Sequence, residues 1–215
     1  MLQRLFIKTP WWARIVFSNY VWRMPANRKV VYLTFDDGPT PVVTPWVLEQ
    51  LKQYNASATF FCIGANVVDY PEVYQQILQE GHTIGNHTYQ HFNGWHTSTS
   101  EYLADTARAA EVIHTDLFRP PYGKIKSGQA KGLAAAMKTE NVKVIMWDVL
   151  SADYDTTISP QQCYMNVAKH VAPGSIIVFH DSEKAFRNLE YTLPKVLSDL
   201  TNEGYAFEKI SMDGL

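Results

Sequence analysis

Short apolar runs rich in β-branched and aromatic residues alternate along the chain with stretches whose apolar positions follow a helical period. Runs of the strand type lie at 29–35, 58–63, 82–85, 142–147, 175–179 and 205–210, with a short one ending at 119. Helical patterns lie at 45–54, 72–80, 98–114, 129–141, 159–172 and in a last stretch ending near 203. Strands separated by such helices form parallel βα units. About seven units in one chain predict an α/β fold and point to a (β/α) barrel, with an open doubly wound sheet as the alternative.

Capping residues mark the beginnings of several predicted helices. Thr44 is placed as an N-cap, with Pro45 at the first helical position. The sequences of 98–101 and 159–162 are capping boxes, in which a serine precedes an acid or amide by three residues. We therefore expect helices to begin at about 45, 99 and 160.

An aromatic-rich segment, residues 1–27, precedes the first βα unit. Residues 10–25 read PWWARIVFSNYVWRMP, and Arg14, Asn19 and Arg23 interrupt the apolar positions. These apolar stretches are too short to span a bilayer, and no hydrophobic core followed by a small-residue cleavage site is seen. The segment could cap the core of the domain or lie in a membrane interface, and the first interpretation is favoured. We therefore expect residues 1–27 to pack on a single domain at 28–215.

Composition narrows the classes of partner. The chain has 215 residues, a net charge of −2 and no block of lysine and arginine, so a nucleic-acid partner is not expected. Cys62 and Cys163 lack the spacing of a metal site and are predicted to be buried, inert thiols. Without a visible export signal the cytoplasm is the default compartment.

Five polar clusters each follow a run of the strand type. They lie at 36–39, 86–91, 119–123, 148–154 and 180–181. In a parallel barrel the carboxyl ends of the strands meet on one face, where active sites lie. We therefore expect these clusters to form one site.

Two of the clusters contain possible metal ligands. Asp36 and Asp37 are followed by Gly-Pro, a pattern that alone more often marks a turn. His87 and His91 are four residues apart, about one helical turn, so both rings could face one ion. Two histidines and one aspartate are the protein ligands of an open catalytic zinc site. By contrast, His180 at the end of a buried run could be a hydrogen-bonded core residue.

The strings TFDDGP, NHTYQH, FRPPYG and HD, in this order, resemble the polysaccharide deacetylase family, the NodB-homology domain of carbohydrate esterase family 4. The resemblance covers about residues 28–210 and makes 28–215 the catalytic domain. It implies a distorted (β/α) barrel of seven or eight units. The implied activity is metal-dependent removal of acetyl groups from N-acetylated amino sugars, such as chitooligosaccharide or peptidoglycan glycan.

The resemblance also implies roles for individual residues. It makes Asp37, His87 and His91 the ligands of one divalent metal ion, zinc by default, with cobalt or nickel as alternatives. It implies that Asp36 is the general base and His180 the general acid. The other implied roles are pairing with the base and the acid (Arg119 and Asp153), donation of a backbone N–H to the oxyanion (Tyr122), and contact with the substrate (Pro121, Tyr154 and Val178).

The fourth cluster departs from the family pattern at two positions. Leu150 stands where the family has an acid, and Tyr154 stands where it has tryptophan, which implies a reshaped acetyl pocket. Hydrolysis of acetylated xylan, hydrolysis of a non-sugar amide, and non-catalytic glycan binding therefore stay open as alternatives. The retained Asp36, Arg119 and His180 argue against the last. A glycan substrate would point to the cell envelope, and the sequence does not specify the oligomeric state.

Overall fold

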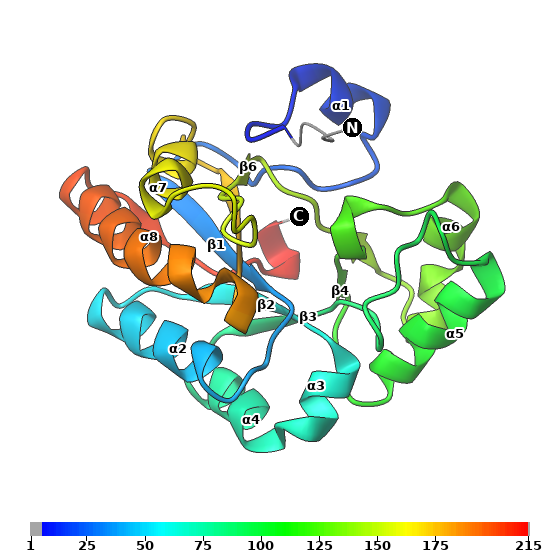
Figure 1. The fold of residues 1–215 in the computed structure, drawn as a ribbon. Helices are drawn as coiled ribbons and strands as arrows, with labels where there is room; N and C mark the ends of the chain where they lie inside the picture. Colours follow the sequence, from blue (N-terminus) through cyan, green and yellow to red (C-terminus); the bar gives the residue numbers. More distant parts are fainter. Residues whose placement is uncertain (1–5, 215) are drawn as a thin grey trace.

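In a computed structural model of the chain, which describes residues 6–214, a curled parallel sheet is surrounded by helices (Figure 1). The strands are β1 (Val30–Asp36), β2 (Ala58–Cys62), β3 (Thr83–Asn86), β4 (Leu117–Phe118), β5 (Lys143–Val144), β6 (Val149–Leu150), β7 (Ile176–His180) and β8 (Ala206–Phe207). Their order is β5-β4-β3-β2-β1-β7-β6, and β8 pairs with the first residues of β1. The predicted α/β fold, a distorted barrel, is thereby confirmed.

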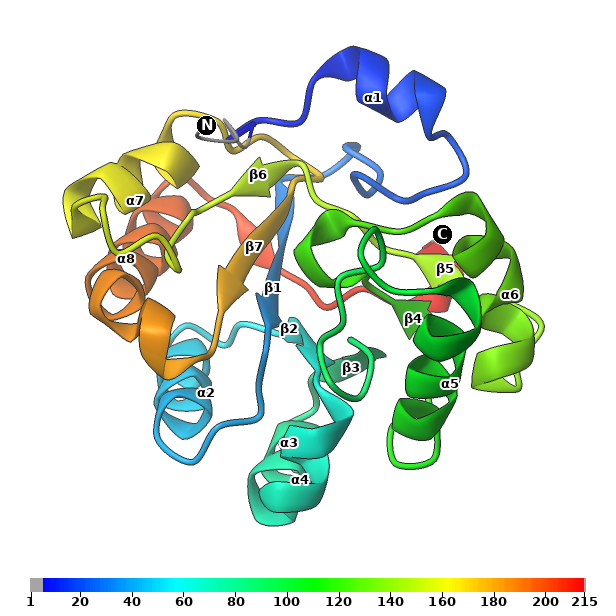
Figure 2. The ribbon, with the colours of Figure 1, turned by 45° about the vertical axis from the view of Figure 1, so that its right-hand side comes forward.

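Helices cover the outer side of this sheet (Figures 1 and 2). They are α1 (Trp11–Val16), α2 (Val43–Gln53), α3 (Gly64–Asp69), α4 (Pro71–Gln79), α5 (Thr99–Ala110), α6 (Ser127–Met137), α7 (Pro160–Ala168) and α8 (Glu183–Asn202), with short 3₁₀ turns η1 (Pro121–Gly123) and η2 (Met212–Gly214). The helix α1 differs from the others because it stands at one end of the molecule, beyond β6.

The central strand β1 is buried along its whole length. A parallel strand covered on both faces shows a continuous apolar run rather than alternation, which explains the sequence of residues 30–35. Phe35 stacks with Phe60 on β2 and with Phe179 on β7, at centroid distances of 5.1 and 5.9 Å. A fully buried phenylalanine contributes about 1.5–3 kcal/mol to stability. This packing holds β1 between its neighbours and so fixes Asp36 at its carboxyl end.

The two cysteines lie in this interior, as predicted. Cys62 and Cys163 are both buried and neither forms a disulfide. Burial raises the pKa of the Cys163 thiol to about 12, which keeps it protonated and unreactive at neutral pH.

The helix beginnings agree with two of the three predicted caps. Ser98 and Ser159 each accept a hydrogen bond from the backbone N–H three residues later. The Thr44 cap was wrong, because α2 begins at Val43, two residues before the predicted start, and Val42 occupies the N-cap position without a side-chain bond. The Thr44 hydroxyl instead donates to Asp181 Oδ2 over 2.6 Å, a partner far away in the sequence.

The N-terminal segment lies along the seam between β5 and β6, the two ends of the sheet order. Val21 N–H donates to Val144 O at 2.9 Å, and Val21 O accepts from Met146 N–H at 2.7 Å. Further along, Leu150 N–H donates to Ile7 O at 2.8 Å. The predicted strand at 142–147 is shorter in the sheet because its later residues have other partners: Met146 N–H bonds to this segment, and the Ile145 and Met146 carbonyls accept from the Arg119 guanidinium.

A buried carboxylate, Asp148, fastens the same segment to the domain. Its side chain is fully buried and forms ion pairs with Lys8 at 2.7 Å and with Arg14 and Arg23 at 3.3 Å each. The Ser175 hydroxyl donates to it at 2.7 Å. Residues 1–5 of the segment, and residue 215, lie outside the described residues. No helix within 6–214 has the length and apolar character needed to cross a bilayer.

Candidate active site

Three potential metal ligands meet where β1 and β3 end. The ring nitrogen His91 Nε2 lies 3.2 Å from Asp37 Oδ1, and His87 Nε2 lies 3.8 Å from the same oxygen. The ligand atoms all lie within 4.8 Å of one another. The predicted convergence of the two rings is therefore present, but the segment is a loop and not a helical turn, with Thr88 and His91 at φ of 63° and 56°.

The chemistry of this cluster fits a divalent cation. Asp37 Oδ1 is buried and has no hydrogen-bond partner among the described residues, although a buried carboxylate oxygen normally has one. Burial alone would raise the pKa of Asp37, but the adjacent His91 ring and the charge of His180 hold it below its usual range. Burial lowers the pKa of His87 to about 4. An ionised aspartate and a neutral imidazole are the forms that bind metal.

The orientation of His87 also suits ligation. Its Nδ1 lies 2.7 Å from the backbone oxygen of Arg119. That acceptor fixes the proton on Nδ1 and leaves the Nε2 lone pair directed at the cluster. The cluster is therefore consistent with a site for a divalent metal.

Asp36 lies beside the cluster in a different environment. Its carboxylate is nearly buried and accepts from Arg119 Nη1 at 2.6 Å. Arg119 is fully buried and makes three further bonds, to Thr34 Oγ1, Ile145 O and Met146 O, at 2.7, 3.1 and 3.1 Å. Burial lowers the pKa of Arg119, and the charge of Asp36 opposes that effect. The guanidinium thus stays ionised and holds the Asp36 carboxylate in one orientation.

The second charge pair joins His180, at the end of β7, to Asp153. Asp153 Oδ1 lies 2.7 Å from His180 Nδ1, and Oδ2 accepts the His180 backbone N–H at 2.8 Å. Burial by itself lowers the pKa of His180, but the charge and hydrogen bond of Asp153 outweigh it and raise the pKa to about 9. His180 is therefore protonated at neutral pH, with Nε2 left available.

These groups line one cleft of about 410 Å³. Its polar floor holds Asp36, Asp37, His87, His91 and His180. Its other lining residues are Tyr122, Gly123, Lys124, Trp147, Leu150, Tyr154, Val178, Ser182 and Lys184. The cleft thus combines catalytic-type charges with an apolar wall, the mixture expected of a small-molecule site.

Most of the predicted site residues therefore lie together. Arg119 and Asp153 are buried beside Asp36 and His180 without lining the cleft. Tyr122 lies at its rim with φ of 60°, and its ring lies 4.6 Å from that of His91. Pro121 is buried within η1 and does not line the cleft, so the structure does not place it in contact with a substrate.

Sequence reasoning assigned no role to Asp181, which positions the turn that carries Asp37. Asp181 Oδ1 accepts the Gly38 N–H at 3.0 Å, and burial together with the charge of Asp37 raises its pKa to about 7. A Cβ on Gly38 would lie only 2.0 Å from Asp181 Oδ2, so this close approach requires glycine. Its position directly after His180, at the end of a strand, was the available signal. Trp147, Lys124 and Lys184 were also missed as lining residues.

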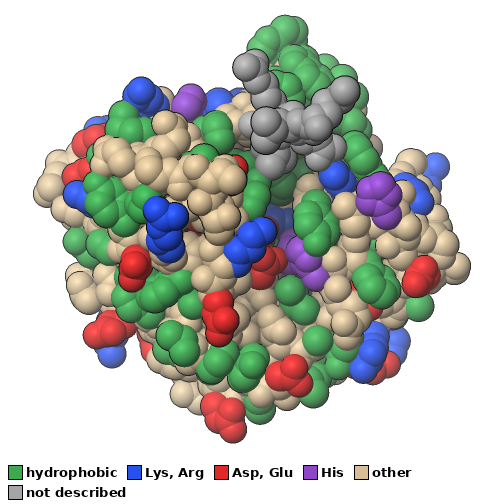
Figure 3. Space-filling model, in the orientation of Figure 1, with side chains coloured by type: hydrophobic (Ala, Val, Ile, Leu, Met, Phe, Trp, Pro, Cys, Tyr) green, Lys and Arg blue, Asp and Glu red, His purple; other side chains and the backbone are tan. Residues whose placement is uncertain are grey.

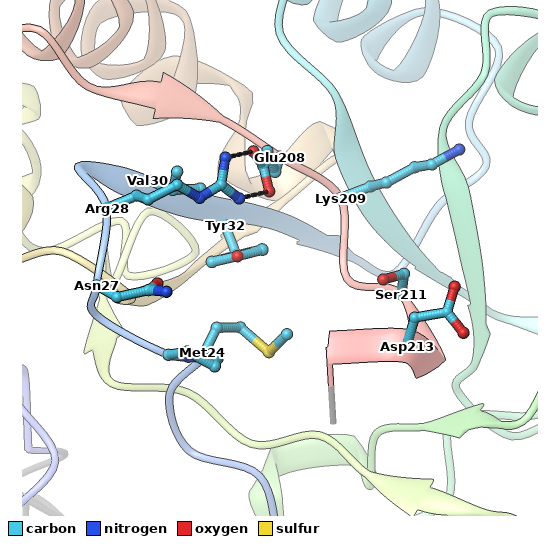
Figure 4. A pocket seen from close by; sticks show the side chains of 10 residues that line it. Met24, Asn27, Arg28, Val30, Tyr32, Glu208, Lys209, Ser211 and Asp213 are labelled. Carbon is cyan, nitrogen blue, oxygen red and sulfur yellow. Dashed lines mark hydrogen bonds and ion pairs between the residues drawn. The ribbon is translucent and has the colours of Figure 1, made fainter.

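A second pocket, of about 310 Å³, lies at the opposite end of β1 (Figure 4). Two of its charged lining residues, Arg28 and Glu208, bond to each other at 3.0 Å. These two charges neutralise one another, and the lining residues include no histidine and none of the metal-ligand cluster found among residues 6–214, so this pocket differs chemically from the cleft.

The comparisons with known proteins agree with this geometry. A sequence model of the family described as polysaccharide deacetylase matches residues 23–142. The chain belongs to the polysaccharide deacetylase family. It is therefore an enzyme, a hydrolase of carbon–nitrogen bonds other than peptide bonds.

Individual relatives share most of the chain. A peptidoglycan-N-acetylglucosamine deacetylase of Bacillus cereus is 34% identical over 201 residues, which cover 90% of this chain and 92% of the relative. The peptidoglycan-N-acetylmuramic acid deacetylase PdaC of Bacillus subtilis is 32% identical over 191 residues, 86% of this chain and 38% of its own length. A crystal structure of a peptidoglycan N-acetylglucosamine deacetylase superposes with a TM-score of 0.83 at 32% identity, covering 94% and 95% of the two chains.

Proposed function

We propose that this chain removes the acetyl group from N-acetylglucosamine residues of peptidoglycan. The observation that carries the proposal is 34% identity to an enzyme of that name across 92% of its length. The cleft supports it, because each group that amide hydrolysis needs is present there with a partner that sets its charge. Chitooligosaccharide, N-acetylmuramic acid, acetylated xylan and a non-sugar amide are the competing substrates.

A divalent ion held by Asp37, His87 and His91, zinc by default, would polarise the acetyl carbonyl and lower the pKa of a water molecule. Asp36 is the proposed base that takes the proton from the attacking water, and the Arg119 bond that holds its carboxylate beside the cluster supports this role. The Tyr122 backbone N–H is the proposed donor to the oxygen that gains negative charge.

His180 completes the reaction in this proposal. An amine nitrogen is too basic to leave unprotonated, so the leaving group needs an acid. Asp153 holds a proton on His180 at neutral pH and occupies Nδ1, which leaves Nε2 to donate to the nitrogen. Base and acid thereby keep opposite charges within one cleft.

The apolar wall is the proposed binding surface for the acetyl methyl. Val178, Leu150 and Tyr154 line it, and the Tyr154 ring lies edge-on to His180 at 4.9 Å. Leu150 adds apolar surface where the family has an acid, and burial raises the pKa of Tyr154 to about 12, so its hydroxyl stays neutral. This wall accommodates a methyl group without an unpaired charge.

Two lysines favour an anionic glycan over neutral chitin. Lys124 follows η1, and Lys184 lies in the first turn of α8, so they approach the cleft from different strands of the barrel. Peptidoglycan carries carboxylates on its lactyl and peptide groups, whereas chitooligosaccharide carries none. Cations at the rim would attract the first substrate and leave the second unaffected.

Acetate release from a panel of substrates tests the proposal. The panel comprises peptidoglycan glycan, chitooligosaccharide and acetylated xylan, with Asp36→Asn as the inactive control. We expect peptidoglycan to give the highest kcat/KM, and mass spectra of digested product to show the lost acetyl on glucosamine. Loss from muramic acid, or preference for xylan or chitin, would replace the proposed substrate. Release from none of the three would contradict the proposal altogether.

A further inference from the structure

The helix α1 presents an apolar face to solvent. Large apolar side chains along residues 6–17 are strongly exposed: Phe6 59%, Trp11 72%, Trp12 47%, Ile15 66%, Val16 65% and Phe17 48%. We call this set the α1 face. In Figures 1 and 3, α1 stands out from the fold and hydrophobic side chains gather over it. Scattered exposed apolar residues are ordinary, but a contiguous group of six marks an interaction surface.

A helix that packs on a core turns its large apolar side chains inward, but α1 turns them toward solvent. Ala13 is buried, and Arg14 reaches toward the buried Asp148 at 3.3 Å, while the residues on either side of them face outward. Lys8 and Arg23 bind the same carboxylate. Three ion pairs to Asp148 thus attach the segment to the domain, and they fix the orientation of the α1 face relative to it.

The size of the α1 face argues against a second copy of this chain as its occupant. Taking roughly 200 Å² for each large side chain, the exposed fractions correspond to about 700 Å². A standard protein–protein interface buries about 800 Å² on each partner. A self-complementary dimer through this face alone would stay below that size even if every exposed part of the six side chains were covered.

The composition of the α1 face fits the interfacial region of a bilayer. Tryptophan and phenylalanine concentrate at the level of lipid headgroups, and aliphatic side chains insert just below them. Residues 1–35 contain lysine and arginine but no aspartate or glutamate. Lys8, Arg14 and Arg23 each leave about 30% of the side chain exposed at the base of the face. Acidic lipid headgroups would therefore be attracted and not repelled.

We propose that the α1 face binds peripherally to a membrane surface that contains anionic lipid. Ile7, in the same segment, packs against Leu150 and Val178 in the wall of the cleft. The membrane contact and the cleft are therefore joined through β6 and β7, and binding would set the height and tilt of the cleft above the lipid. This inference does not depend on which glycan is the substrate.

Co-sedimentation with lipid vesicles tests the proposal on the full chain. Vesicles of phosphatidylcholine alone are compared with vesicles that also contain phosphatidylglycerol. We expect the protein to bind the second kind more tightly. The double variant Trp11→Ser/Ile15→Ser should lose at least about tenfold in partitioning, because it removes two of the most exposed apolar groups.

Val68→Ser is the matched control, because Val68 is 52% exposed on α3, at the end of the molecule away from α1 (Figures 1 and 2). It should partition like the wild type, and all three proteins should release acetate from a soluble substrate at equal rates. Absence of vesicle binding by the wild type would overturn the proposal, as would binding by the double variant equal to that of Val68→Ser. A wild-type dimer that the double variant loses, without vesicle binding, would assign the face to self-association instead.

Discussion

Replacing Asp153 by asparagine removes the negative charge beside His180 and keeps the size and shape of the side chain. The wild-type acid should be active while His180 is protonated, so the rate should fall as pH rises through about 9. An opposite charge in direct contact shifts a pKa by about 1–3 units. Asp153→Asn should therefore move the alkaline limb of kcat/KM downward by about 1–3 pH units, while the acid limb stays in place.

The hydrogen bonds of Asp153 also allow an estimate of how much the same substitution lowers the free energy of unfolding. Its Oδ1 accepts from Ser151 and Tyr154, and its Oδ2 accepts the His180 N–H. An asparagine must turn its NH₂ toward at least one of these donors, and the least costly choice loses the His180 N–H bond. The free energy of unfolding of the variant should therefore be about 1–3 kcal/mol lower than that of the wild type.

Stability should depend on pH for the same reason. The folded-state pKa of His180 is raised above its ordinary value of 6.5, so the stabilisation is complete below 6.5 and lost as pH rises through about 9. Denaturant unfolding between pH 6 and 10 should show this loss in the wild type and a smaller loss in Asp153→Asn.

The kinetic measurement decides whether His180 is the acid. An alkaline limb of kcat/KM that stays at the wild-type pH in Asp153→Asn, or that survives His180→Ala, would refute that role.

Three further predictions concern the metal, the base and the acyl pocket. His91→Ala should lose stoichiometric metal by elemental analysis, whereas the exposed His96→Ala should keep it; retained metal in the first would remove His91 as a ligand. Asp36→Asn should keep metal and lose roughly 10²-fold or more in kcat, and activity within a few-fold of wild type would mean that no base is needed. Tyr154→Trp should change the ratio of acetyl to longer acyl turnover, and equal effects on all acyl groups would place the ring outside the pocket.

The ends of the strands could be predicted from the sequence because a buried strand is a continuous run of apolar residues. The run at 29–35 is apolar since β1 is covered on both faces, and the polar residues directly after it must then lie at the carboxyl edge. The same reasoning brought Asp37, His87 and His91 together. It failed on how they converge, because the loop of residues 87–91 depends on left-handed backbone at His91 rather than on helical spacing.

Contacts between distant parts of the chain could not be predicted from the local pattern of residues. Thr44 has the sequence signature of a cap, but Asp181, 137 residues away, takes its hydroxyl. Residues 145–147 have the composition of a strand, but the N-terminal segment and the Arg119 side chain take several of their backbone hydrogen bonds. The short helix α3 was not predicted, since its six residues are fewer than two helical turns and carry no side-chain cap.

The seam between β5 and β6 ties the completion of folding to the order of synthesis. The ion pair of Lys8 with Asp148 spans 140 residues, and the bond from Arg23 to Pro173 spans 150. Such contacts give a high contact order and close only after most of the chain has left the ribosome. Until then the edges of β5 and β6 are unpaired strands, the kind of surface that aggregates or recruits chaperones. These contacts of Lys8 and Arg23 can therefore form only after residues 148 and 173 have been synthesised.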